Sequence, residues 1–281
     1  MAESPSSVTN ESPALSPSFY EGKWAEPDYS AGSLRNWLVK KERFFLRRLA
    51  GKKGLVLDLG CGGGWKLYTR VGPVIGVDLS TAAVAAAQTI YSGGAVADLA
   101  HLPFRDGSFD YVVSSDVLGH ILLEDKDQVL HEIRRVLKKG GETLHYIETE
   151  ASDPLTQHAR ARPSLYRRYF LEPEGHLGLE PPRRALERFR KAGFRPLREE
   201  TAYRMLLYLE RFLRCFDNEY AETPVMGILV RLGRAIAKFT PLALATNVLI
   251  ALALELTDRL FPSEWGSGVL VHYANEEEQW N

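Results

Sequence analysis

The chain has 281 residues, of which 45% are hydrophobic and 25% are charged, and its formal net charge is −1. These proportions are ordinary for a soluble globular protein, and the length allows one large domain with an insertion. The near-neutral charge excludes a global attraction to nucleic acid or anionic lipid. Two cysteines, Cys61 and Cys215, are too few for a zinc cluster, and no metal site is predicted. We expect a cytoplasmic protein.

The N-terminal region divides into two segments. Residues 1–18 are rich in Ser and Pro and lack the basic and apolar runs of a signal peptide, so we expect a disordered tail. Residues 19–53 are predicted to form a lid that carries Tyr20, Trp24 and Tyr29, followed by a basic helix. The basic face of that helix is interpreted as solvated, with a phosphate or membrane contact as the alternative.

Residues 54–200 alternate between strand and helix patterns. The strands are predicted over 54–60, 73–80, 93–100, 109–117, 141–150 and 194–204, and the helices over 65–70, 81–90, 124–141 and 181–194. Residues 151–180 are expected to be irregular. This order predicts a Rossmann-like α/β fold with a mostly parallel sheet and helices on both faces.

Residues 201–262 are predicted to form a mostly helical apolar insertion before a last strand and an acidic tail over 263–281. The uncharged run of about 16 residues, from Phe239 to Leu254, is shorter than the roughly 20 that span a bilayer. A buried helical cap is the first interpretation. A helix lying on a membrane surface and a homodimer interface through residues 203–262 are the alternatives.

The stretch VLDLGCGGGW, residues 56–65, places Asp58 before a glycine-rich turn. Such a turn brings bare backbone close to a ligand. A nucleoside triphosphate site would need Lys followed by Ser or Thr after the last glycine, and Trp65 stands there instead. The G-x-G-x-x-G spacing of dinucleotide sites is also missing. S-adenosylmethionine is the third ligand that uses such a turn, and its ammonium group suits the carboxylate of Asp58.

Two further acids support the same ligand. Asp78 ends the second predicted strand, where a carboxylate can accept both hydroxyls of a ribose; a helix-capping role is the alternative. Asp98 ends the third predicted strand, where it can accept from an adenine amino group while Leu99 lies against the ring. The acids at three strand ends are therefore predicted to contact three parts of one nucleoside ligand.

VLDLGCGGG, GVDLS, ADLAHLPFRDGSFDYVVSSDVLGHI and EIRRVLKKGG together resemble the class I S-adenosylmethionine-dependent methyltransferases, and most closely the branch acting on quinones, sterols and other small molecules. The resemblance covers residues 54–150. It implies a seven-stranded sheet whose last strand is antiparallel, with S-adenosylmethionine as the cofactor. The cofactor-binding residues it implies are Asp58, Gly60, Cys61, Gly62, Asp78, Leu79, Asp98, Leu99 and Ser115.

Methyl transfer from a sulfonium is an in-line displacement, and a base is needed only when the acceptor carries a proton. His120, just past the fourth strand, is the main candidate for that base, and His176 and His158 are weaker ones; packed histidines are the alternative.

The predicted function is methyl transfer to a small, apolar acceptor such as a lipid, quinone or natural product. No nucleic-acid partner is expected, and peripheral membrane contact remains open. An RNA or protein methyltransferase and a non-catalytic S-adenosylmethionine-binding interaction protein are the alternatives.

Overall fold

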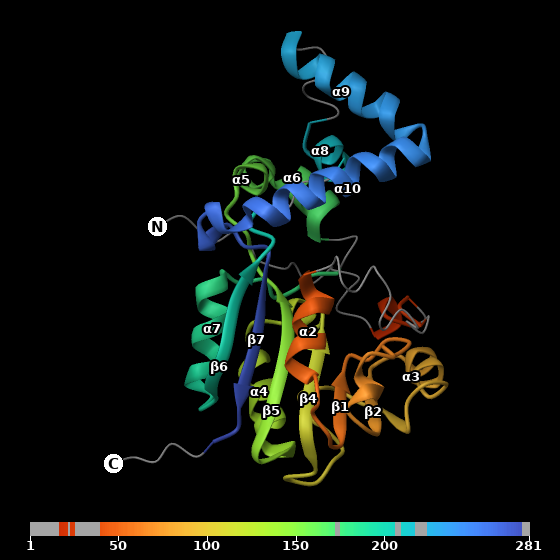
Figure 1. Ribbon diagram of the computed structural model, residues 1–281, viewed down its shortest axis with the longest axis vertical. Helices are drawn as coiled ribbons and strands as arrows, with labels where there is room; N and C mark the ends of the chain where they lie inside the picture. The colour runs from red at the N-terminus through yellow and green to blue at the C-terminus, as the bar shows by residue number, and fades with distance from the viewer. Residues whose placement is uncertain are drawn as a thin grey trace.

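The computed structural model describes residues 17–21, 23–25, 40–171, 175–205, 209–216 and 224–276 (Figure 1). Its seven strands form one sheet in the order β3-β2-β1-β4-β5-β7-β6, and only β7 runs antiparallel to its neighbours. The predicted Rossmann-like fold and its antiparallel last strand are therefore confirmed. The strands are β1 Val56–Leu59, β2 Val74–Asp78, β3 Gly93–Val96, β4 Phe109–Ser115, β5 Leu137–Glu148, β6 Arg195–Ala202 and β7 Gly268–Ala274.

Two layers of helices cover the sheet, each with its own hydrophobic cluster. On one face, α4 (Lys126–Val136) and α7 (Pro182–Lys191) pack on the sheet through residues such as Ile133 and Phe189. On the other face, α2 (Lys40–Leu49) and α3 (Thr81–Ala87) pack through residues such as Phe45. The strand order reverses between β1 and β4, so their carboxyl ends border the crevice where ligands bind in such sheets.

Two predicted helices differ from the structure. The helix expected over 65–70 is only a 3₁₀ turn, η3 (Tyr68–Arg70). The helix expected over 124–141 ends at Val136, before the two glycines, and β5 begins at the next residue. The reason is non-local, because the side chain of Asn275, after β7, donates 3.2 Å hydrogen bonds to the carbonyls of Arg134, Leu137 and Lys138. These bonds satisfy carbonyls that a longer helix would have used.

Residues 151–180 were expected to be irregular, and the structure corrects this. They contain α5 (Pro154–Arg160), α6 (Pro163–Tyr166) and a π-helical turn, η5 (Arg167–Leu171). Asp153 caps α5 by accepting from the backbone N–H groups of Leu155 and Thr156, and Pro154 occupies the first helical position. An N-cap acid followed by proline is a helix-start signal that the sequence carried.

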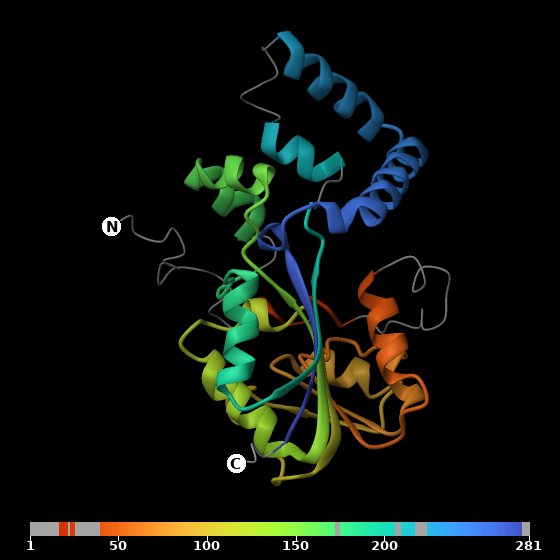
Figure 2. The ribbon, with the colours of Figure 1, turned by 60° about the vertical axis from the view of Figure 1, so that its left-hand side comes forward.

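The insertion before β7 is helical, as predicted. It contains α8 (Leu209–Phe216), α9 (Pro224–Ala237) and α10 (Thr240–Thr257), followed by the short turns η6 (Asp258–Leu260) and η7 (Ser263–Trp265). Figures 1 and 2 show these helices projecting beyond the end of the sheet at which β5 leads into α5. The buried-cap interpretation is wrong for α10, since none of its described side chains is buried.

Within the described part of the chain, no single helix is long and apolar enough to cross a membrane. Helices α9 and α10 meet that criterion only as a pair, and a bend of 119° separates them. Asn247, which interrupts the apolar run of α10, accepts a 2.9 Å hydrogen bond from the backbone N–H of Leu209. This bond joins α10 to the start of α8.

Candidate functional site

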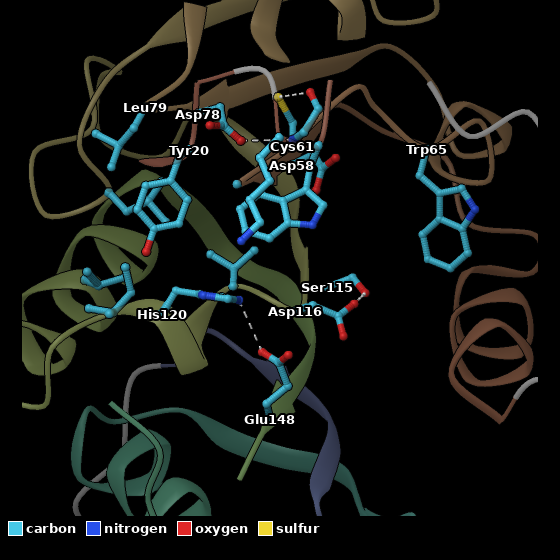
Figure 3. A pocket seen from close by; sticks show the side chains of 18 of the residues that line it. Tyr20, Asp58, Cys61, Trp65, Asp78, Leu79, Ser115, Asp116, His120 and Glu148 are labelled. Atoms are coloured by element: carbon cyan, nitrogen blue, oxygen red, sulfur yellow. Dashed lines mark hydrogen bonds and ion pairs between the residues drawn. The ribbon is translucent and has the colours of Figure 1, made fainter. Parts of the chain in front are cut away.

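A cavity of about 910 Å³ opens at the carboxyl ends of the parallel strands (Figure 3). This volume is at the upper end of the range for small-molecule sites, so a nucleoside ligand and a small second ligand fit together. All nine predicted cofactor-binding residues line it: Asp58, Gly60, Cys61, Gly62, Asp78, Leu79, Asp98, Leu99 and Ser115. The parallel topology brings them together, because each group follows the end of a different strand.

Asp58 lies at the floor of the cavity and is almost fully buried. The hydroxyl of Tyr91 donates to its carboxylate at 2.7 Å. Burial raises the pKa of Asp58 to about 8, and the nearby charge of Asp78 adds to the rise, while the Tyr91 hydrogen bond opposes it. A cation that entered the cavity would stabilise the ionised form of this carboxyl.

Asp78 ties the glycine-rich turn to β2. Its carboxylate accepts from the backbone N–H of Gly62 at 2.9 Å and from that of Ser80 at 2.9 Å. Ser80, rather than Asp78, caps α3, because its hydroxyl accepts from the N–H of Ala83. The capping alternative for Asp78 is therefore wrong, and part of its carboxylate faces the cavity.

Glycine is required at position 60. Its φ is +59°, and a Cβ there would lie 2.5 Å from a methyl carbon of Val117. A side chain would therefore both strain the backbone and displace the segment that follows β4. Cys61 is a buried free thiol in the same tight turn, consistent with a small residue filling the loop.

The segment after β4 forms the next wall of the cavity. The hydroxyl of Ser115 donates to Asp116 at 2.6 Å, and Asp116 also pairs with Lys41 of α2. Asp116 has φ of +61°, which is rare for a residue other than glycine and is typical of sites where function fixes the backbone. Sequence analysis did not identify Lys41, because only the fold brings α2 to this strand end.

The N-terminal aromatic residues Tyr20 and Trp24 lie beside the glycine-rich turn. The backbone N–H of Gly63 donates to the carbonyl of Trp24 at 2.6 Å, and Tyr20 and Trp24 line the cavity. Glu21 accepts from the backbone N–H groups of Thr81 and Ala82, which fixes the segment to the start of α3. Tyr29, the third predicted lid residue, is outside the described residues.

The three candidate histidines have different positions. His120 lines the cavity, and burial lowers its pKa. His176 lies beside it, with ring centroids 4.9 Å apart, although His176 is not itself in the cavity lining. His158 instead packs on Phe216 of α8, 4.9 Å between ring centroids, so it is excluded as a base at this site.

Glu148, at the end of β5, is the main residue that sequence analysis missed. It lines the cavity, and its Oε1 lies 2.9 Å from Nε2 of His176. Burial acts to raise the pKa of Glu148, but the contact with His176 lowers this pKa overall. Figure 3 shows His120 and Glu148 pointing toward one another, on the opposite side of the cavity from Asp78 and Leu79. The position of Glu148 at the end of a predicted strand was the sequence feature that could have identified it, as for Asp58 and Asp78.

Some buried polar atoms of the cavity wall have no hydrogen-bond partner among the described residues. They include the hydroxyl of Tyr68 and Nε1 of Trp65. Both groups donate hydrogen bonds, and a buried donor without a partner destabilises the fold unless a ligand or water accepts from it.

Residues 57–144 match a family model described as a methyltransferase domain. The core of this chain is a class I S-adenosylmethionine-dependent methyltransferase domain. An arsenite methyltransferase of Aquipseudomonas alcaligenes is 36% identical over 131 residues, 40% of this chain and 37% of that protein. A demethylmenaquinone methyltransferase of Lactiplantibacillus plantarum is 36% identical over 140 residues, 45% of this chain and 57% of that protein.

The methyltransferase fold extends beyond the matched residues. Phosphoethanolamine N-methyltransferase 2 of Haemonchus contortus, solved with S-adenosyl-L-methionine, superposes with a TM-score of 0.51 at 22% identity, over 88% of this chain and 53% of that one. At this identity the likeness concerns the fold alone. The chain spans 37% to 63% of the length of the first curated relatives that it matches. The matched segment contains Asp58, Asp78, Asp98 and His120, whereas Glu148 and His176 lie after it.

The basic helix is not simply a solvated face. Lys40 pairs with Asp258 at 2.5 Å, Arg43 pairs with Glu255, and Lys52 pairs with Glu142 at 2.6 Å. Arg43 and Lys40 hold α2 to the end of α10 and to the turn after it, and Lys52, which follows α2, pairs with β5. Part of the positive charge of this segment is therefore used in ion pairs within the protein.

Proposed function

We propose that this protein transfers the methyl group of S-adenosylmethionine to a small, largely apolar acceptor. The observation that carries this proposal is the convergence of Asp58, Asp78, Asp98 and the glycine-rich turn on one cavity within a methyltransferase domain. The cavity has room for a second small ligand. The relatives named for arsenite and demethylmenaquinone support a small-molecule acceptor.

Each residue near the cofactor has a proposed task. Asp58 faces the ammonium group of the methionine end, and Asp78 accepts from the ribose hydroxyls while holding Gly62. Asp98 and Leu99 take the adenine ring. The bound sulfonium supplies an already activated methyl group, so the protein's contribution is alignment and exclusion of water. Ser115 and Asp116 stand where the methyl group would face the acceptor.

The acceptor end of the cavity combines polar and apolar side chains. His120 and Glu148 supply the polar groups, while Ile121, Leu122 and Leu177 supply the apolar wall. Among the described residues, none from 203–262 lines the cavity, so the insertion does not enclose the acceptor as an apolar cap would. The insertion instead contributes an exposed surface outside the cavity.

That surface supports delivery of the acceptor from a lipid bilayer. Leu244, Leu249 and Leu256 of α10 are 64%, 67% and 85% exposed, and large exposed apolar patches mark protein or membrane contact sites. Residues 224–254 include three cations and no acid, which matches the negative surface of an anionic membrane. The helices project from the same end of the sheet as the cavity (Figure 2). An apolar acceptor dissolved in the bilayer would therefore reach the protein at the end of the sheet where the cavity lies.

Calorimetric titration with S-adenosylmethionine and S-adenosylhomocysteine tests the cofactor. We expect micromolar binding, and Asp78→Ala should weaken it by about 10- to 100-fold, because a hydrogen bond to a charged group contributes about 1.5–3 kcal/mol. Asp106→Ala is the matched control, since Asp106 is an exposed acid outside the cavity lining. Absence of binding by the folded wild type would overturn the proposal in favour of an interaction protein.

Vesicle sedimentation tests whether the exposed surface of α10 binds a membrane. The wild type should bind vesicles of phosphatidylglycerol and phosphatidylcholine, and the triple variant Leu244→Ser, Leu249→Ser, Leu256→Ser should not. Leu197→Ser removes an exposed leucine of β6 and should leave vesicle binding unchanged. A wild type that forms a homodimer through these helices and ignores vesicles would contradict the membrane contact.

A further inference from the structure

Three side chains from separate segments converge at the acceptor end of the cavity. They are His120 after β4, Glu148 at the end of β5 and His176 after η5. Nε2 of His176 lies 2.9 Å from Oε1 of Glu148, and Nε2 of His120 lies 3.7 Å from Oε2 of the same carboxylate. One nitrogen or oxygen atom from each residue lies within 4.8 Å of the other two.

The contacts of the two rings indicate which nitrogen of each faces the Glu148 carboxylate. Nδ1 of His120 is 3.1 Å from the carbonyl of Gly175, and Nδ1 of His176 is 3.4 Å from the carbonyl of Phe170. A carbonyl oxygen only accepts, so each Nδ1 carries a proton, and the Nε2 of a neutral ring presents its lone pair. In that state, both Nε2 atoms face a carboxylate, which also only accepts. A proton or a cation is needed to stabilise such an arrangement.

The carboxylate itself supplies an independent observation. Oε2 of Glu148 is buried and accepts no hydrogen bond from any described residue. A buried carboxylate oxygen that accepts no hydrogen bond costs free energy that folding alone does not recover. A cation placed between Oε2 and the two Nε2 atoms would remove that cost.

The backbone holds the three groups in place before any ligand arrives. The carbonyl of Gly119 accepts from the N–H groups of Leu177 and Gly178, which joins the His120 and His176 segments. A Cβ at Gly178 would lie 1.8 Å from the carbonyl oxygen of Ile121, so only glycine allows this approach. A Cβ at Gly119 would lie 2.8 Å from Oε2 of Glu148. Glycines therefore make room on both sides of the cluster.

We propose that His120, Glu148 and His176 bind a divalent transition-metal ion. Two ligands about 2.1 Å from a metal, at angles of about 90–110°, are separated by ~3.0–3.4 Å. The observed separations of 2.9 Å and 3.7 Å from the Glu148 oxygens lie on either side of that range. Two imidazoles and one carboxylate suit Zn²⁺, Mn²⁺, Co²⁺ or Fe²⁺, and a carbonyl partner on each Nδ1 is typical of metal-binding histidines.

The site would leave coordination positions open toward the cavity, because His120 and Glu148 line it. This part of the inference rests on the proposed function: an oxygen of the acceptor, such as a hydroxyl, would bind there beside the methyl donor. Binding to the metal would lower the pKa of that hydroxyl and orient its oxygen. His120 would then serve as a metal ligand, and no histidine base would be required.

Metal titration of the full chain, purified without a histidine tag and dialysed against a chelator, tests the site. Addition of Co²⁺ should give a visible absorption spectrum that saturates at one equivalent, and Zn²⁺ should abolish it. His176→Ala and Glu148→Gln should each weaken Co²⁺ binding by at least the ~10- to 100-fold that loss of an outer-shell partner costs. His101→Ala and His131→Ala, which remove exposed histidines, are the matched controls and should bind as the wild type does.

The outcomes separate this inference from the proposed function. Glu148→Gln keeps the shape of the side chain, so weak Co²⁺ binding by a variant that still melts cooperatively identifies a lost ligand. Equal Co²⁺ binding by the wild type, His176→Ala and Glu148→Gln would overturn the metal site and leave a histidine–carboxylate ion pair. Titration of the same samples with S-adenosylmethionine is independent, so cobalt binding without cofactor binding would reject only the proposed function.

Discussion

The two ends of the cavity are built in different ways. At the cofactor end, Asp58, Asp78 and Asp98 lie at or just after the ends of three successive strands, and neighbouring members are twenty positions apart in the sequence. At the acceptor end, His120, Glu148 and His176 are each separated by 28 positions and include a residue held by a helical segment after β5. The cofactor end is therefore encoded by local turns, whereas the acceptor end depends on long-range packing. We expect mutations to affect the two ends independently.

The largest effect should come from Gly60→Ala at the cofactor end. The substitution strains a left-handed backbone by about 1 kcal/mol and places a Cβ 2.5 Å from Val117, and overpacking of this kind costs about 1–3 kcal/mol. We expect S-adenosylmethionine affinity to fall by at least ~30-fold in calorimetry, while Co²⁺ binding at the acceptor end is kept.

Gly140→Ala is the matched control for Gly60→Ala. Gly140 has φ of +70°, and a Cβ there would meet no atom within 4 Å. The two variants thus share the backbone strain and differ in the clash. Equal loss of cofactor affinity in both would mean that general destabilisation, rather than the turn itself, controls binding.

The next effect concerns pH. Burial raises the pKa of Asp58 to about 8, so this carboxyl holds a proton in the ligand-free protein at neutral pH. The ammonium group of S-adenosylmethionine favours the ionised form, and binding must release that proton. We therefore expect affinity to fall about tenfold per pH unit between about pH 7 and pH 6, a range that lies below the ordinary pKa of the ligand's own ammonium group.

Calorimetry in buffers of different ionisation enthalpy measures the proton directly, and we expect release of ~1 proton at pH 6.5. Asp58→Asn should bind weakly at every pH and release none. Tyr91→Phe removes a hydrogen bond that lowers the pKa of Asp58, so its affinity should decline from a higher pH than that of the wild type. A pH-independent affinity of the wild type would show that Asp58 does not face the ammonium group.

The same contrast explains what the sequence could predict about the fold. The seven strands were found because buried parallel strands are short apolar runs between turn residues. The end of α4 was misplaced because Asn275, more than a hundred residues away, satisfies the carbonyls at its end. The helices of residues 151–180 were missed because their start depends on a single capping acid, Asp153, in a segment of mixed composition.

The site shows a similar division. The cofactor-binding candidates were identified because each acid is adjacent to a strand end and a glycine or turn motif, and all of them line one cavity. Glu148 and Lys41 were missed because neither lies in a motif, and only the sheet topology and the docking of α2 bring them to the cavity. Their roles depend on contacts that spacing alone does not encode.

A smaller effect is expected at the contact between helices α8 and α10, beyond the acceptor end. Asn247→Ala removes the acceptor of the Leu209 N–H, a helix-start contact worth about 1 kcal/mol. Hydrogen exchange should become about fivefold faster in α8, with no change in β1, β2 or β3. Thr246→Ala, at the adjacent position of α10, is the control. Faster exchange in the cofactor strands would contradict the independence of the two ends.

The smallest effect should come from the segment that lies over the glycine-rich turn. Glu21 accepts from the N–H groups of Thr81 and Ala82 at 3.1 Å and 2.9 Å, and it is exposed to solvent. Exposed contacts of this kind contribute about 0.5–1 kcal/mol, so Glu21→Ala should speed the release of S-adenosylmethionine by about two- to fivefold in stopped-flow measurements. Glu21→Gln keeps the accepting oxygen and should recover most of the loss. If both variants release the cofactor as the wild type does, Tyr20 and Trp24 pack on the turn without retaining the ligand.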